Sequence, residues 1–396
     1  MIFKKGELKL LWPFYLVYLL FGLSAVILPF MIIYFQDLGL NYLQLSIVAI
    51  ATGLGIVVFE VPTGVVADIF SRKYSVIIGF FLTGLTVILV PFTSNFYLLV
   101  ILMFFSGAGM SFISGAEEAW VIDNLSAYKR DDLKQEFFLK MQITMAFGLI
   151  LAPIIGAIIT KSYSMKWLWV LYGIAFFINV IILAFFTEEK YVPKKINFFK
   201  GLKNTFANSK KGFEYILKNK VISLLVLAGV LATFIDIGLN GHQPFLVGLS
   251  MPEYGLGYVY AVMAIFIIAA SFATRLLAKY KVRMVISIIT LIRMLLYIAI
   301  FFVSPPYFLI GAALIIFYGT FVNLGDPILS TYLHKNIKTD IRATVISVRS
   351  MVITLAIVII RIIGGYLMDI LGPQKVIALG GILGMFALVT YWKIKD

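Results

Sequence analysis

The sequence predicts an all-α integral membrane protein with twelve transmembrane helices in two six-helix bundles. Of the 396 residues, 62% are hydrophobic and only 13% are charged, whereas soluble domains are roughly half apolar and a quarter charged. The mean hydropathy is +1.02. The apolar residues also fall into runs long enough to cross a bilayer, which takes about 20 residues for a helix. We therefore expect most of the chain to lie in lipid.

The predicted spans are apolar runs bounded by charged residues, Gly, Pro or Asn. They cover residues 10–35, 42–66, 74–93, 96–122, 138–160, 167–186, 221–247, 255–278, 284–303, 307–333, 344–367 and 375–392. The first run is too long for a signal peptide and contains two prolines, so we expect it to be a span.

Lysine and arginine predict the orientation. If the N-terminus is cytoplasmic, 26 of the 33 basic residues lie at or beyond the cytoplasmic ends of the spans, 3 at or beyond the outer ends and 4 deeper within spans. Cytoplasmic loops carry such an excess, so both termini are predicted to be cytoplasmic, in a multi-pass protein of the inner (cytoplasmic) membrane. The net charge of +14 is then a topology signal, and we expect no nucleic-acid partner.

A long connection, residues 187–220, divides the chain. It contains nine lysines and apolar residues at roughly helical spacing, which is typical of amphipathic helices on an anionic inner leaflet. We predict an N-terminal bundle over 1–186, this linker, and a C-terminal bundle over 221–396, in a monomer. Two such bundles are a transporter architecture with a substrate site near the midplane.

The loop after the second span carries a motif of small and charged residues. It contains Gly64, Ala67, Asp68, Arg72 and Lys73. This motif closely resembles the loop signature of the major facilitator superfamily, and the likeness covers essentially the whole chain. The resemblance implies a charge-linked latch through Asp68 and Arg72. Ile69 and Ser71 replace the arginine and glycine of the family, which leaves the latch one partner short.

The fifth span carries Gly148, Pro153 and Gly156, and this pattern is similar to that of drug:proton antiporters in the superfamily. Proline bends a helix and small residues permit close packing, so a kinked, tightly packed helix is the alternative interpretation. The fourth span ends in Glu117 and Glu118, which resembles a branch of bacterial and archaeal exporters.

Ionisable residues inside a membrane are costly, so each is a functional candidate. Asp236 lies roughly 22 Å into the seventh span, at 1.5 Å per residue, in a polar and breakable stretch. It is our first candidate for a proton-coupling or cation-recognising carboxylate. The alternative is a carboxylate locked to Arg293 or Arg361, either of which could instead bind an anionic substrate.

Other charges lie nearer the cytoplasmic ends of their spans. For Glu60, Glu117 and Glu118 we favour structural pairing at an inner gate over a transport role. Asp326 and Arg349 are predicted to form an inner gate pair. The chain has no cysteine and two histidines, so we expect no metal site, no cofactor and no enzymatic activity.

These features predict a secondary active transporter that works by alternating access. The favoured function is proton-coupled efflux of amphipathic or cationic small molecules, with protons as coupling ion. The alternative is an uptake symporter or facilitator for a small nutrient or organic anion.

Overall fold

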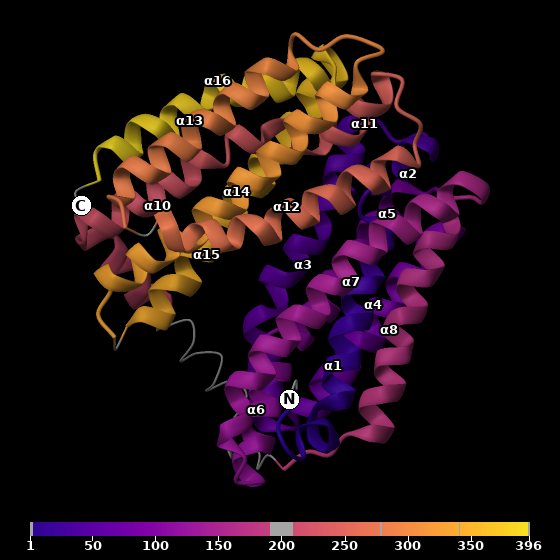
Figure 1. Ribbon diagram of the computed structural model, residues 1–396, viewed down its shortest axis with the longest axis vertical. Coiled ribbons are helices and arrows are strands. Elements are labelled where there is room, and N and C mark those ends of the chain that lie inside the picture. Colours follow the sequence, from indigo (N-terminus) through magenta and orange to yellow (C-terminus); the bar gives the residue numbers. More distant parts are fainter. Residues whose placement is uncertain (1–2, 191–208, 278, 340, 395–396) are drawn as a thin grey trace. The chain divides into compact units, whose positions relative to one another are not determined.

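The computed structural model describes residues 3–190, 209–277, 279–339 and 341–394, and within these ranges every regular element is helical (Figure 1). Twelve helical segments are long and apolar enough to cross a membrane, from Glu7–Ile27 to Pro373–Trp392. The predicted all-α class and number of spans are therefore confirmed. Residues 191–208, most of the predicted amphipathic linker, lie outside the described residues.

The chain forms two compact units. One contains residues 1–29 and 51–204, and the other contains residues 30–50 and 205–396. Residues 30–50 hold the end of the first span and the start of the second, so the helix over Tyr42–Ile69 begins in the second unit and continues in the first.

The first unit is built around aromatic side chains. Its elements are α1 (Glu7–Leu23), η1 (Ser24–Ile27), most of α3 (Tyr42–Ile69), α4 (Arg72–Leu89), η2 (Val90–Phe92), α5 (Phe96–Ile113), α6 (Ala116–Ala127), η3 (Asp131–Leu133), α7 (Lys134–Ser162) and α8 (Lys166–Phe186). α4 packs along α5 and α8, while α1 packs along α7 and α8. Phe14, Phe80, Trp120, Phe137 and Phe176 fill the core of this unit.

Close packing of α1 and α7 depends on glycine. A methyl group at Gly148 would lie 2.6 Å from the Leu19 carbonyl, and one at Gly22 would overlap the Met145 carbonyl. Pro153 and Gly156 are buried in the same helix, which runs unbroken over Lys134–Ser162. The predicted fifth-span motif is thus a tight helix–helix contact in this structure.

The second unit contains α2 (Met31–Asp37), the start of α3, α10 (Lys220–Ala232), η4 (Ile235–Gly241), α11 (His242–Gly248), α12 (Gly255–Leu277), α13 (Val282–Ile300), α14 (Phe308–Asn336), α15 (Arg342–Leu371) and α16 (Pro373–Trp392). α13 packs along α14 and α16, and α12 packs along α14 (Figure 1).

Many large apolar side chains point out of both units. The side chain of Phe185 is 79% exposed and that of Phe302 is 78% exposed. Exposed apolar surface on this scale is unfavourable in water but not in hydrocarbon. The chain is therefore a multi-pass membrane protein.

Candidate functional site

The seventh span is interrupted in its middle. α10 ends at Ala232, the 3₁₀ stretch η4 covers Ile235–Gly241, and α11 continues over His242–Gly248. The break falls where polar and small residues predicted it. The first span is also interrupted, by η1 over Ser24–Ile27. Interrupted helices at corresponding positions of two halves mark the binding region in many transporters, because the break leaves backbone groups available.

Asp236 lies in the first turn of η4, and its carboxylate forms an ion pair with an arginine. Arg293 Nη2 from α13 is 3.3 Å from Asp236 Oδ1. The Tyr318 hydroxyl from α14 donates a short hydrogen bond to the same oxygen and accepts one from Arg293 Nη2 at 2.8 Å. Of the two possibilities left open by the sequence, the structure has the carboxylate paired with Arg293.

Two tyrosines extend this cluster to His242. Tyr297 Oη lies 2.6 Å from His242 Nε2, and the Tyr297 and Tyr318 rings stack with centroids 3.7 Å apart. Both tyrosines are almost fully buried. Sequence reasoning missed them, because nothing in the pattern separates them from the other tyrosines among the 21 of the chain.

Arg361 on α15 lies beside the same cluster. Its charge acts on Asp236, Tyr297 and Tyr318. Yet it forms no ion pair with any described residue, and its buried Nε has no hydrogen-bond partner. The structure therefore gathers Asp236, Arg293 and Arg361 into one region. With Asp326 and Arg349, whose charges also act there, it holds two carboxylates and three guanidinium groups.

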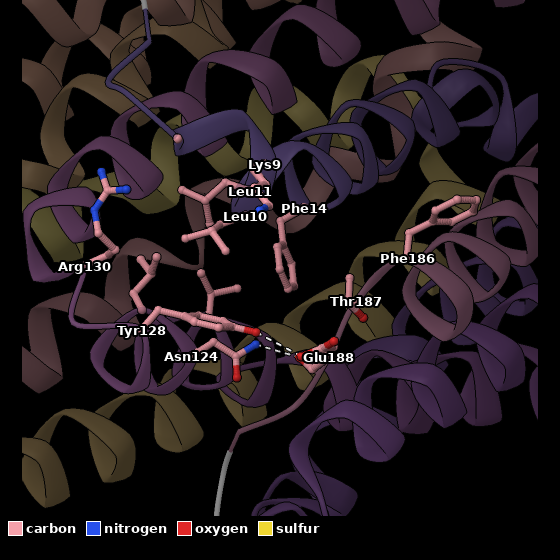
Figure 2. A pocket seen from close by; sticks show the side chains of 13 residues that line it. Lys9, Leu10, Leu11, Phe14, Asn124, Tyr128, Arg130, Phe186, Thr187 and Glu188 are labelled. Carbon is pink, nitrogen blue, oxygen red and sulfur yellow. Dashed lines mark hydrogen bonds between the residues drawn. The ribbon is translucent and has the colours of Figure 1, made fainter.

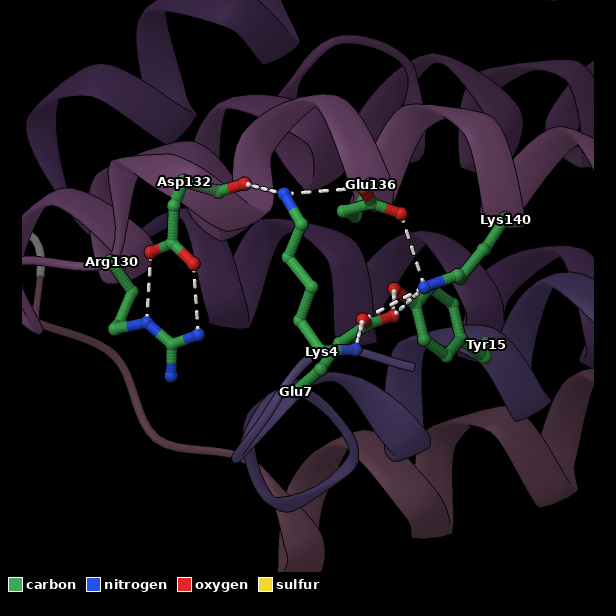
Figure 3. Close-up of polar contacts among 7 residues, drawn as sticks. All are labelled: Lys4, Glu7, Tyr15, Arg130, Asp132, Glu136 and Lys140. Carbon is green, nitrogen blue, oxygen red and sulfur yellow. Dashed lines mark hydrogen bonds and ion pairs between the residues drawn. The ribbon is translucent and has the colours of Figure 1, made fainter. Parts of the chain in front are cut away.

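The first unit shows how a buried carboxylate is neutralised. Glu7 is completely buried, and Lys140 Nζ lies 2.6 and 2.7 Å from its two oxygens (Figure 3). The Tyr15 hydroxyl donates to Glu7 at 2.8 Å, as does the Lys4 backbone N–H. Lys140 also pairs with Glu136 at 3.2 Å. Every charge here has a partner, so this network is structural.

Glu117 has no such network. Its side chain is 4% exposed, it forms no ion pair with a described lysine or arginine, and its buried Oε1 lacks a hydrogen-bond partner. Its polar contact is a hydrogen bond with the Tyr18 hydroxyl of α1. The structure thus holds a buried carboxyl group without a counter-ion in the fourth span.

A break in the fourth span positions Glu117. α5 ends at Ile113 and α6 begins at Ala116, with Gly115 at φ +72°, a conformation that favours glycine. Glu117 therefore lies in the first turn of α6, where the positive end of the helix dipole favours a negative charge. The sequence predicted one uninterrupted span here. Glu118, one residue on, is exposed, and so is Glu60 in α3.

The loop motif is a cluster of ion pairs within the first unit. Arg72 pairs with Asp123 of α6 through a short contact, and with Asp68 at 3.7 Å. Lys73 Nζ donates to the carbonyls of Ala184 and Thr187 at 3.1 and 2.6 Å. A methyl group at Gly64 would meet no described atom within 4 Å, so Gly64 is not a site of tight packing in the described structure.

Glu189, which the sequence did not suggest, completes this cluster. Its carboxylate accepts hydrogen bonds from the backbone N–H groups of Arg72 and Lys73 at 2.7 and 3.1 Å, and from the Ser71 hydroxyl. It therefore caps the N-terminus of α4.

Asp326 and Arg349 were predicted to form a gate pair. Each lies close enough for its charge to act on the other. No ion pair within 4.0 Å joins them among the described residues, in contrast to Asp236 and Arg293, which are paired at 3.3 Å.

A cavity of about 480 Å³ lies among the ends of α1, α6 and α8 (Figure 2). Its polar groups bind one another: the Tyr128 hydroxyl donates to the Glu188 carboxylate at 3.0 Å, and Asn124 Nδ2 donates to the Glu188 carbonyl at 2.7 Å. Hydrogen bonds from Lys190 and then from Tyr128 lower the pKa of Glu188. These contacts fix the residues after α8 against α6, so we regard this cavity as structural.

No group of three or more His, Cys, Asp or Glu residues that could hold a metal ion occurs in the part of the chain that the structure describes.

Comparison with known proteins agrees with this architecture. The profile of the Major Facilitator Superfamily matches residues 14–360. An uncharacterized MFS-type transporter of Bacillus subtilis, YxaM, is 23% identical over 97% of this chain and 96% of its own length. The multi-drug resistance efflux pump PmrA of Streptococcus pneumoniae is 23% identical over 58% of this chain and 59% of its own. A Na⁺, Li⁺, K⁺/H⁺ antiporter of Planococcus maritimus is 26% identical over 54% of this chain and 52% of its own length.

Solved structures share the fold. The nucleoside transporter NupG superimposes with a TM-score of 0.79 over 99% of this chain and 100% of its own, at 16% identity. A D-xylose-proton symporter superimposes with a TM-score of 0.70 over 98% of each chain, at 14% identity. With twelve spans, interrupted helices and a profile match over most of its length, the chain belongs to the Major Facilitator Superfamily and is a membrane transporter.

Proposed function

We propose that this transporter exports amphipathic, cationic small molecules in exchange for protons, and that Glu117 carries the proton. The observation that carries this proposal is the burial of Glu117 without a cation. Burying an ionised carboxylate alone costs several kcal/mol or more, so such a group is stable in a dry site as the neutral acid.

The surroundings of Glu117 suit a group that gains and loses a proton. Burial favours the neutral acid, whereas the helix N-terminus and the Tyr18 hydroxyl favour the carboxylate. Water or a cationic molecule reaching Glu117 would shift this balance toward the carboxylate. A proton and a cation would then compete for one site, which is the requirement for antiport.

We place Glu117 ahead of Asp236 in this role, because Asp236 is held by Arg293 and Tyr318. Two relatives support export and ion exchange, since one is named as a multi-drug efflux pump and another as a cation/proton antiporter. We further propose that the chain resides in the cytoplasmic membrane with both termini inside.

Uptake is the second candidate. The D-xylose-proton symporter that shares the fold is one reason to consider it, and the surplus guanidinium of Arg361, which suits an anionic nutrient, is another. The direction of exchange separates the two. In an exporter, a proton gradient drives substrate against the flow of protons, and in a symporter it drives substrate along with them.

The test uses inside-out membrane vesicles that hold a proton gradient. Adding a lipophilic cationic dye should partly collapse the gradient through the wild-type protein, and dye should accumulate. Glu117→Gln should reduce both signals at least about tenfold, because the amide cannot carry the proton. Glu118→Gln is the matched control, since its side chain is adjacent and exposed. Normal exchange in Glu117→Gln would contradict the proposal.

A further inference from the structure

Charge is unbalanced where α15 meets the interrupted seventh span. The described groups there are three guanidinium groups, Arg293, Arg349 and Arg361, and two carboxylates. The charges of Arg293 and Arg349 act on Asp326, whereas the carboxylate that acts on Arg361 is Asp236. That carboxylate is occupied, because Arg293 Nη2 lies 3.3 Å away and the Tyr318 hydroxyl donates to the same oxygen. One positive charge is left over, and it belongs to Arg361.

The fold fixes the position of Arg361. A methyl group at Gly364 would overlap the carbonyl of Ile237 in η4, so α15 and η4 are in direct backbone contact there. Residues three apart share a helix face, so Arg361 lies on the face of α15 that meets η4, one turn before this contact. This places its guanidinium near the Asp236 carboxylate and the hydroxyl groups of the two buried tyrosines.

Arg361 lacks the partners that Arg293 has. Arg293 Nη2 donates to both Asp236 and Tyr318. Arg361 makes no hydrogen bond or ion pair with any described residue, although its Nε is buried. Nearby polar groups are committed elsewhere, since His242 Nε2 and Tyr297 Oη are bonded to each other at 2.6 Å. An unpaired guanidinium in a membrane span is expensive, and such residues mark ligand sites.

We propose that Arg361 binds a carboxylate on the transported molecule. A guanidinium presents a planar fork of N–H donors that matches the two oxygens of a carboxylate. This inference rests on the proposed function for the direction of transport and for the cationic part of the cargo. Together they define the cargo class as amphipathic molecules that carry both a basic and an acidic group.

The test compares two dyes that differ in one group. Rhodamine B carries a cationic ring system and a free carboxylate, and its ethyl ester is the same molecule with the carboxylate masked. Equilibrium binding to the purified full-length protein is measured by fluorescence anisotropy. Wild type should bind the acid at least about fivefold more tightly than the ester, and added inorganic phosphate should compete with the acid only weakly, because phosphate lacks the apolar body.

The variants locate the contact. Arg361→Gln should lose at least about tenfold in affinity for the acid and little for the ester. Arg361→Lys should keep part of the preference, because it retains the charge without the fork. Arg275→Gln is the control, as it removes an exposed arginine of α12. Thermal melting confirms that each variant folds, and the lysine variant decides the outcome if the glutamine variant does not fold.

Two results would overturn the inference. One is a wild-type protein that binds both dyes equally, and the other is an Arg361→Gln variant that keeps the preference for the acid. Because binding is measured without a gradient, failure here is distinct from failure of proton exchange. A protein that binds the acid more tightly than the ester but moves no protons would support the Arg361 site and contradict the proposed proton-coupled export.

Discussion

Glu117 and Asp236 are both acids within membrane spans, yet they differ in one kind of contact. Asp236 has a guanidinium 3.3 Å away, whereas Glu117 is 4% exposed and has a hydroxyl group as its polar partner. The cost of a buried charge depends on whether an opposite charge is present. For this reason we propose a structural role for Asp236 and a proton-carrying role for Glu117.

The Asp236–Arg293 pair can be tested with a double-mutant cycle. Asp236→Asn and Arg293→Gln should each lower the free energy of unfolding by up to about 3 kcal/mol, because each leaves one charge buried alone. The double variant should be more stable than the sum of the two predicts, because it removes both charges. The measurement is the melting temperature of the purified protein. Strictly additive losses would mean that the two groups do not stabilise each other.

Sequence reasoning identified Asp236, Arg293, Arg361 and Glu117 as candidates because charge is rare in lipid-facing segments. It could not decide which of them are paired, since pairing joins residues 57 positions apart, as in Asp236 and Arg293. Tyr297 and Tyr318 were missed for the same reason. Their importance comes from stacking on each other and bonding to His242 and Asp236.

At the scale of elements, the N-terminus of α3 is held by α15. Asp369 accepts hydrogen bonds from the backbone N–H groups of Tyr42 and Leu43 at 2.7 and 3.0 Å. A methyl group at Gly365, one turn earlier, would lie 2.7 Å from both the Tyr42 carbonyl and Ser46 Oγ. All these residues belong to the second unit. The carboxylate therefore caps a helix that is distant in sequence.

Loss of this cap should loosen the start of α3. Asp369→Ala should cost about 1 kcal/mol, the usual value of a helix cap, and Asp369→Asn less, because its amide oxygen still accepts one hydrogen bond. The chain has no cysteine, so a spin label at a single introduced cysteine near residue 41 reports on this segment alone. Its mobility should increase in Asp369→Ala, and unchanged mobility would argue against the cap.

The spans themselves were predictable, because the bilayer imposes a minimum length of apolar helix. The break in the seventh span was predictable too, from the polar and small residues of 236–244. The break in the fourth span was not, since it depends on one residue, Gly115 at φ +72°, within an otherwise apolar run. That break places Glu117 at a helix N-terminus.

In the molecule as a whole, we propose that a proton and a cationic cargo compete for the carboxyl group of Glu117. This competition requires that Glu117 be stable both as the neutral acid and as the carboxylate, each under a different condition. Burial makes the neutral acid stable, and the approach of a cation makes the carboxylate stable. Binding of cargo must therefore release a proton.

Proton release on binding is the most direct measurement of this claim. Purified protein in weakly buffered solution is titrated with a lipophilic cation while a pH indicator follows the released acid. Wild type and Glu118→Gln should release about one proton for each molecule bound, and Glu117→Gln should bind without release. Equal proton release from wild type and Glu117→Gln would contradict the account.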